Sequence, residues 1–124
     1  MDWSMIWIVA GLLAVMVIWK RLSLIPPAAA REHLREGALV VDVRSAGEFR
    51  GGHLPDAVNI PLDELQDGLP RHVTDKARVL LLHCLSGTRS GIARRQLKST
   101  GYQNVYNLGS YRRARQIVSG VRDL

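Results

Sequence analysis

VLLLHCLSGTRS, at residues 79–90, is the stretch of this chain that decides its fold. The apolar run Val79 to Leu82 is typical of a strand in a parallel sheet that is covered on both faces. A helix is predicted directly after it, at residues 90–99. Cys84 therefore lies between the carboxyl end of a buried strand and the amino end of a helix, where parallel α/β sheets bind their ligands.

The loop between this strand and this helix has the composition of an anion site. A loop so short turns its backbone N–H groups inward, and the dipole of the helix adds to their field. Gly87 permits the backbone angles of such a turn, and Arg89 adds a fixed positive charge whose planar fork suits an oxyanion. These features lower the pKa of a thiol, so we expect Cys84 to be a reactive thiolate and not an inert core residue.

The other elements follow from the same kind of pattern. Three more strands are predicted, at residues 38–43, 57–60 and 104–108. Further helices are predicted at residues 28–36, from Pro61 to Leu69 and at residues 111–118, and the segment through Gly51 and Gly52 is predicted as a loop. Strands that alternate with helices form parallel sheets, so the predicted fold class is α/β.

An apolar segment precedes the predicted domain. Residues 3–19 carry no charge, and as a helix that rises ~1.5 Å per residue they span about 25 Å of a hydrocarbon core that is about 30 Å thick. Tryptophans lie near both ends of the segment, where indole rings favour the membrane interface. We therefore expect a transmembrane anchor with its juxtamembrane segment at residues 1–25 and one folded domain at residues 26–124.

Positive charge flanks the apolar segment on its carboxyl side. Lys20 and Arg21 follow it directly and can extend to the lipid headgroups, so that Leu24 and Ile25 lengthen the span. Positive charge is retained on the cytosolic side, so we expect the domain to face the cytoplasm. The alternative is a signal peptide cleaved near Ala28–Ala30, which would export the domain; the lack of positive charge before the apolar run disfavours it.

Composition limits the classes of function. The chain has 17 Lys and Arg residues against 11 Asp and Glu, a formal charge of +6, which suits small anionic substrates and an anionic membrane surface. Membrane lipid is therefore an expected partner, whereas nucleic acid is not, because the charges are scattered and no aromatic residues alternate with them. The single cysteine excludes a disulfide-stapled scaffold, and no His, Cys and carboxylate spacing indicates a metal site.

Three blocks of the sequence resemble the rhodanese family, and the resemblance covers roughly residues 28–120. Val41-Asp42-Val43-Arg44 with Glu48-Phe49 resembles the family's first strand and the segment that follows it. GHLPDAVNIP, at residues 52–61, is similar to the family's Gly-His-Ile-Pro-Gly-Ala-x-Asn-Ile-Pro block. CLSGTRS, at residues 84–90, resembles its active-site loop. In this order and at these spacings the three blocks are specific for the family.

The resemblance implies a central parallel sheet of about five strands with helices on both faces. It also implies a sulfurtransferase without a metal or organic cofactor. Cys84 would take the outer sulfur of a small donor anion such as thiosulfate and pass it, as a persulfide, to a thiol or protein-cysteine acceptor. The implied substrate-binding loop consists of Leu85, Ser86, Gly87, Thr88 and Arg89. A hydrogen-bonded charge set that supports the loops is expected from Asp42, Arg44 and Glu48.

Two other functions stay open. Cysteine phosphatases and arsenate reductases also bind an oxyanion in a loop from a cysteine to an arginine, but phosphatases place five residues between the two, whereas four separate Cys84 from Arg89. A non-catalytic rhodanese-like binding module is the second alternative, although such modules lack the cysteine. The chain departs from the family after its last strand, where residues 109–111 read Gly-Ser-Tyr instead of two glycines with a tryptophan further on. The terminal helix adds three arginines: Arg112, Arg113 and Arg115. Three surroundings are open for them, namely anionic lipid, an acidic partner and solvent.

Overall fold

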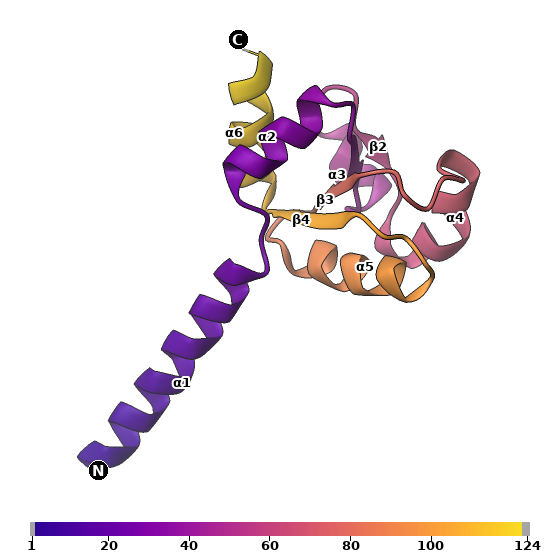
Figure 1. Cartoon of the computed structure of the whole chain (residues 1–124). Coiled ribbons are helices and arrows are strands. Elements are labelled where there is room, and N and C mark those ends of the chain that lie inside the picture. The colour runs from indigo at the N-terminus through magenta and orange to yellow at the C-terminus, as the bar shows by residue number, and fades with distance from the viewer. Residues whose placement is uncertain (1, 123–124) are drawn as a thin grey trace.

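A parallel sheet of four strands lies at the centre of the computed structural model, which describes residues 2–122 (Figure 1). The strands lie in the order β2-β1-β3-β4, with bounds Leu39–Asp42 for β1, Val58–Asn59 for β2, Leu80–His83 for β3 and Val105–Gly109 for β4. Each neighbouring pair is parallel, which confirms the predicted α/β class. The outer ends of the two predicted domain ranges, residue 1 and residues 123–124, lie outside the described residues.

The expectation of about five strands is wrong for residues 2–122, which form a sheet of four. At the outer edge of β4 the chain makes a single parallel bridge, between Leu24 and Asn107. One backbone hydrogen bond supports it, from the Ile25 N–H to the Asn107 carbonyl at 3.0 Å. The next residues, Pro26 and Pro27, have no N–H groups to donate to a longer ladder, so the pairing ends after Ile25.

Helices cover both faces of the sheet, as predicted (Figure 1). A 3₁₀ turn at Leu62–Glu64 precedes α4, and the helices of the domain are α2 (Pro27–Arg35), α3 (Ala46–Arg50), α4 (Leu65–His72), α5 (Thr88–Ser99) and α6 (Tyr111–Arg122). Helix α3 lies in a segment that was predicted as a loop. A capping box begins this helix. The Ser45 hydroxyl accepts from the Glu48 N–H at 3.2 Å, and the Glu48 carboxylate accepts from the Ser45 N–H at 3.1 Å.

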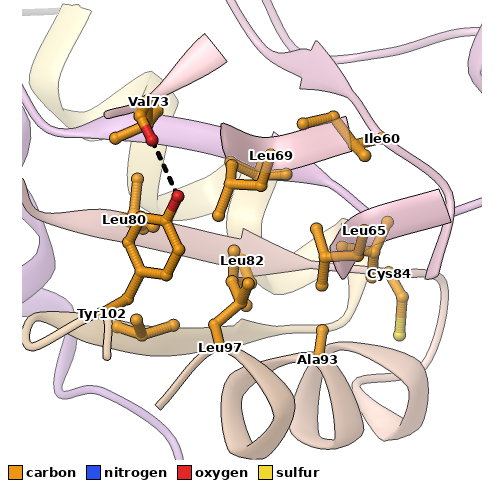
Figure 2. Close-up of a cluster of buried hydrophobic side chains, with 13 residues drawn as sticks. Ile60, Leu65, Leu69, Val73, Leu80, Leu82, Cys84, Ala93, Leu97 and Tyr102 are labelled. Atoms are coloured by element: carbon orange, nitrogen blue, oxygen red, sulfur yellow. Dashed lines mark hydrogen bonds between the residues drawn. The ribbon is translucent and has the colours of Figure 1, made fainter. Parts of the chain in front are cut away.

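Alternate side chains of the strands point to opposite faces and divide the core in two. On the face covered by α4 and α5, Val41 from β1 packs with Leu80 and Leu82 from β3. Figure 2 shows this cluster, in which the Tyr102 hydroxyl donates to the Val73 carbonyl at 2.7 Å. The aromatic ring is thus buried with its polar group satisfied, at the end of the sheet away from Cys84.

The opposite face of the sheet is covered by α2 and α6. Val40 from β1 and Leu81 from β3 pack there against Ala30 of α2 and against Ala114 and Ile117 of α6. Ala30 and Ala114 are fully buried, and their small side chains let the two helices approach the sheet closely. The sheet is therefore covered on both sides, which explains why its central strands are apolar at every position but their polar ends.

Helix α1 (Trp3–Leu22) projects from this domain as a separate rod (Figure 1). The Asp2 carboxylate begins it by accepting from the Ser4 N–H at 3.3 Å. A stretch of 18 residues in this helix has a mean hydropathy of 1.9, and none of the helix residues is buried. The predicted apolar helix is therefore present, with the length and composition of a membrane anchor or of a signal sequence.

The residues after α1 join the domain and do not lengthen the helix. Ile25 is buried between the sheet and the helices α2 and α6, and Leu24 forms the bridge to β4. The Arg113 guanidinium donates to the carbonyls of Ile25 and Leu108, and so it ties this segment to β4. Ser23 alone separates the end of α1 from the paired residues, so the helix leaves the domain without a linker.

Truncation of Ile25 tests whether this segment stabilises the domain. We expect Ile25→Ala to lower the free energy of unfolding by about 2–4 kcal/mol, because it leaves a cavity between the sheet and its helices. Urea unfolding of the full chain in detergent, followed by circular dichroism, measures the loss. Leu22→Ala is the matched control, since the Leu22 side chain is 78% exposed and its truncation should cost less than about 0.5 kcal/mol. Equal stability of the two variants would exclude Ile25 from the core.

Candidate active site

Cys84 directly follows β3 and is held by the neighbouring strand. Its N–H donates to the Gly109 carbonyl at the end of β4, at 3.3 Å. The side chain is fully buried, and Figure 2 shows the sulfur turned toward the helix that carries Ala93, which is α5. The Gly87 N–H donates to Cys84 Sγ at 2.9 Å, so the loop folds back over the sulfur. The sulfur thus lies between the carboxyl end of β3 and the amino end of α5.

The surroundings of the sulfur favour its thiolate form. Burial raises the pKa of the Cys84 thiol, whereas hydrogen bonds from the Ser90 hydroxyl and from the N–H groups of Ser90, Gly87 and Ser86 lower it. The hydrogen bonds outweigh burial, and the pKa lies below its ordinary value. A negative sulfur here also meets the positive end of the α5 dipole.

The shape of the loop depends on Gly87. Its φ of +95° lies in the left-handed region, which side chains with a Cβ rarely adopt. A Cβ at this position would also lie 3.2 Å from the Gly109 Cα, closer than ordinary contact. A bridge between Ser86 and Ser110 holds the loop against the same segment. Residues 109–111, where the chain departs from the family pattern, therefore form one wall of the loop.

Two buried polar side chains brace the loop, and neither was expected from the sequence. Asn107 Oδ1 accepts from the Ser90 hydroxyl at 2.7 Å and from the Gly109 N–H at 2.8 Å, and its Nδ2 donates to the Gly87 carbonyl at 3.2 Å. Ser90 Oγ also lies 3.5 Å from Cys84 Sγ. The Gly87 carbonyl oxygen lies 3.1 Å from the same hydroxyl. Because the hydroxyl has a single proton, it donates to the Asn107 amide, to this carbonyl or to the sulfur, but to only one of them at a time.

A signal for both residues is present in the sequence. Asn107 interrupts a strand that is otherwise apolar toward the core, and a buried amide needs partners for its oxygen and its nitrogen. Ser90 lies in the first turn of α5, at the end of the cysteine loop, where a small polar side chain can face the sulfur. Buried polar residues at the carboxyl end of a parallel sheet are thus candidates for the site.

Arg89, which the sequence assigned to the substrate, binds a carboxylate of the protein itself. Its Nη1 and Nη2 donate to the two oxygens of Glu48 at 2.7 and 3.0 Å, a bidentate pair. Hydrogen bonds from Arg89 and from Ser45 lower the pKa of Glu48 to about 2. The two side chains are 36% and 31% exposed, so the pair adds little stability and serves chiefly to join α5 to α3. Oxyanion binding by Arg89 stays a prediction.

Asp42 and Arg44 form a second ion pair, and this one is buried. Arg44 Nη2 donates to Asp42 Oδ2 at 2.7 Å and to the Gly52 carbonyl at 2.8 Å, so the pair joins the end of β1 to the loop after α3. The charge set expected from Asp42, Arg44 and Glu48 is therefore divided. Asp42 binds Arg44, whereas Glu48 binds Arg89.

His83 adjoins the cysteine in sequence but turns away from its sulfur. Nδ1 lies 3.2 Å from the Cys84 carbonyl oxygen, and Nε2 lies 3.6 Å from Asp42 Oδ2. Burial lowers the pKa of His83, against the opposing effect of the Asp42 carboxylate. Both ring nitrogens therefore face oxygen atoms, as the alternation of the strand predicts, and His83 is badly placed to act as a base toward the sulfur.

Known proteins share this arrangement of sheet and loop. The family model of the rhodanese-like domain matches residues 26–113, which begin after α1. The thiosulfate sulfurtransferase PspE of Escherichia coli (strain K12) is 32% identical over 99 residues, which cover 80% of this chain and 85% of PspE. The uncharacterized protein YqhL of Bacillus subtilis is 40% identical over 80 residues, and the chain spans 62% of its length.

The likeness extends to solved structures. The human single-domain sulfurtransferase TSTD1 matches with a TM-score of 0.65 at 27% identity, over 76% of this chain and 96% of that one. Residues 26–113, which the family model matches, hold the whole sheet and the cysteine loop. The chain therefore belongs to the family of rhodanese-like domains.

Proposed function

We propose that this protein is a sulfurtransferase that carries a sulfane sulfur as a persulfide on Cys84. The observation that carries the proposal is the contact of 2.9 Å between the Gly87 N–H and the Cys84 sulfur, in a loop whose hydrogen bonds lower the pKa of the thiol. Relatives that are named as sulfurtransferases support the same class of reaction.

In the first half of the reaction Cys84 takes sulfur from a small donor anion such as thiosulfate. The thiolate attacks the outer sulfur, a new S–S bond forms, and the S–S bond of the donor breaks as sulfite leaves with its electron pair. The outer sulfur of the resulting persulfide is negatively charged. The loop N–H groups and the amino end of α5 stabilise that charge without having to reorganise.

In the second half a thiol or a protein cysteine removes the sulfur. Its thiolate attacks the outer sulfur, and Cys84 leaves as a thiolate. A thiol with a low pKa is a good leaving group, so the hydrogen bonds that prepare the first step also favour the second. Each step exchanges one bond between sulfur atoms for another and needs no metal or organic cofactor.

The remaining predicted residues have distinct roles in this proposal. Leu85, Ser86, Gly87, Thr88 and Arg89 form the loop that binds the donor, with Arg89 held in place by Glu48. Asp42 and Arg44 support the neighbouring loop and do not contact the sulfur donor. The four residues between the cysteine and the arginine make the loop smaller than that of a cysteine phosphatase, which favours a sulfur atom over a tetrahedral phosphate.

We further propose that α1 anchors the protein in a membrane with the domain on the cytoplasmic side. Lys20 and Arg21 lie in the last turn of the helix, and positive charge at this position is retained in the cytosol. The candidate cleavage site Ala28–Ala30 lies inside α2, where Ala30 is fully buried. Cleavage there would remove Ile25 from the core, so the contacts support a retained anchor over a signal peptide.

The nucleophile is tested by Cys84→Ser. We expect thiosulfate to add the mass of one sulfur atom to the wild type and none to the variant, and cyanide-dependent turnover to fall by more than roughly 10³-fold. Mass spectrometry of the intact chain and the thiosulfate:cyanide assay measure the two effects, and circular dichroism checks the fold. Turnover that persists in the serine variant, or efficient hydrolysis of aryl phosphates by the wild type, would contradict the proposal.

The variant Ser90→Ala tests the hydrogen bond from the Ser90 hydroxyl to the Cys84 sulfur. Loss of the hydroxyl removes a hydrogen bond that stabilises the thiolate, so the pKa of Cys84 should rise and the thiolate should form at higher pH. The pH dependence of alkylation by iodoacetamide measures the shift, and turnover near pH 7 should fall several-fold and recover at alkaline pH. Ser99→Ala, at the other end of α5, is the control. An unchanged alkylation midpoint would mean that the Ser90 hydroxyl donates to an oxygen, of Asn107 or of the Gly87 carbonyl, and not to the sulfur.

Orientation is tested by protease treatment of spheroplasts that contain the full chain. Because Lys20 and Arg21 hold the carboxyl end of the helix in the cytosol, the domain should survive external protease and be digested only after lysis. An epitope on the domain, followed by immunoblotting, reports the result. Digestion in intact spheroplasts, or a mature chain that starts near Arg31, would show an exported domain instead.

A further inference from the structure

A hollow of about 600 Å³ lies where α1 leaves the domain, beside the amino half of α5. Its two walls differ in character. Val15, Met16 and Trp19 of α1 form an apolar wall, whereas Arg94 and Arg95 of α5 form a basic one. Lys20, Ser23 and Asn107 also line the hollow, at the junction with β4.

The described residues that line the hollow include positive charges and no carboxylate. Three cations line it, Lys20, Arg94 and Arg95, and no Asp or Glu is among its lining residues. Arg94 is held in place, because its Nε donates to the Val105 carbonyl at 3.0 Å. Lys20 lines the same space from α1, and Arg95 lines it from the position after Arg94 in α5. The site is therefore complementary to a negatively charged group.

The apolar wall indicates what carries that negative group. The α1 side chains are exposed over the whole length of the helix, and Trp19 is 73% exposed at its carboxyl end. A soluble anion would satisfy the cations but leave this wall in contact with water. An amphiphile with an anionic head and a hydrocarbon chain covers both surfaces at once.

We propose that the hollow between α1 and α5 binds one anionic phospholipid. The phosphate lies between Lys20, Arg94 and Arg95, and an acyl chain runs along the apolar face that includes Met16 and Trp19. Leu24 and Ile25 pair with β4, and α5 packs on β4, so the basic residues of α5 lie beside the end of α1 and meet the headgroups at the depth of Trp19. This inference rests on the proposal that α1 is a membrane anchor.

The test uses the full chain in nanodiscs of phosphatidylcholine that contain a minority of phosphatidylglycerol. Native mass spectrometry of the released protein measures which lipid it retains, and we expect the wild type to retain phosphatidylglycerol preferentially. Lys20→Gln combined with Arg95→Gln should reduce that preference about 30-fold, since each cation at an anionic surface contributes about fivefold. Neither residue touches the cysteine loop, so thiosulfate:cyanide activity in detergent should not change.

Lys98→Gln combined with Arg71→Gln is the matched control, because it removes the same charge from exposed positions outside the hollow. It should keep the preference for phosphatidylglycerol. An equal loss in both double variants would show that charge alone attracts the lipid, and it would overturn the site. Displacement of the lipid by glycerol phosphate at equal concentration would overturn it too, because the acyl chain would then contribute nothing. A wild type with no preference would overturn it as well.

Failure of the site can be separated from failure of the anchor or of the enzyme. Brominated acyl chains quench tryptophan, and all three tryptophans lie in α1, so quenching reports insertion of the helix. Quenching without lipid preference would overturn the lipid site alone. No quenching would overturn both the anchor and the lipid site, while turnover with thiosulfate in the same sample would still support the sulfurtransferase.

Discussion

The close contact between Gly87 and Gly109 is the constraint on which the candidate site depends. Each glycine has a positive φ, and a Cβ on Gly87 would lie 3.2 Å from the Gly109 Cα. Gly87 can therefore lie this close to the end of β4 only because it has no side chain. From this position the Gly87 N–H reaches the sulfur, while the Gly109 carbonyl binds the Cys84 N–H. The end of β4 thus acts as the template of the cysteine loop.

Asn107 extends this template into the interior of the domain. Its amide satisfies Ser90, Gly109 and Gly87 together, so a buried polar side chain connects α5, β4 and the loop. Loss of such an amide would leave several buried groups unpaired, which costs more than the bonds themselves contribute. The Ser90 hydroxyl also connects this network to the Cys84 sulfur. When Cys84 is a thiolate, donation to the sulfur becomes favourable, and Asn107 Oδ1 keeps the Gly109 N–H as its partner.

The sequence predicted what depends on local pattern and missed what depends on long-range contact. The apolar run before Cys84 and the alternation with helices were sufficient for the α/β class, and the position of the cysteine at a strand end followed from them. The expected fifth strand is absent from the sheet, because Pro26 and Pro27 stop the pairing that Ile25 begins. The two prolines themselves were visible in the sequence. The partner of Arg89 was missed for another reason. Glu48 lies 41 positions away, and no local pattern links the two residues.

The junction after α1 connects the apolar helix to the same template. Leu24 side-chain carbon Cδ2 lies 3.2 Å from the point where a Gly109 Cβ would stand, so Leu24 packs directly against Gly109. Arg113 closes the contact from α6 by binding the carbonyls of Ile25 and Leu108. Ser23 alone separates the last residue of α1 from the first residue paired with β4, so the helix starts at a fixed point beside the sheet. If α1 lies in a bilayer, the residues paired with β4 directly after Ser23 therefore keep the domain, and with it the cysteine loop, close to the membrane surface.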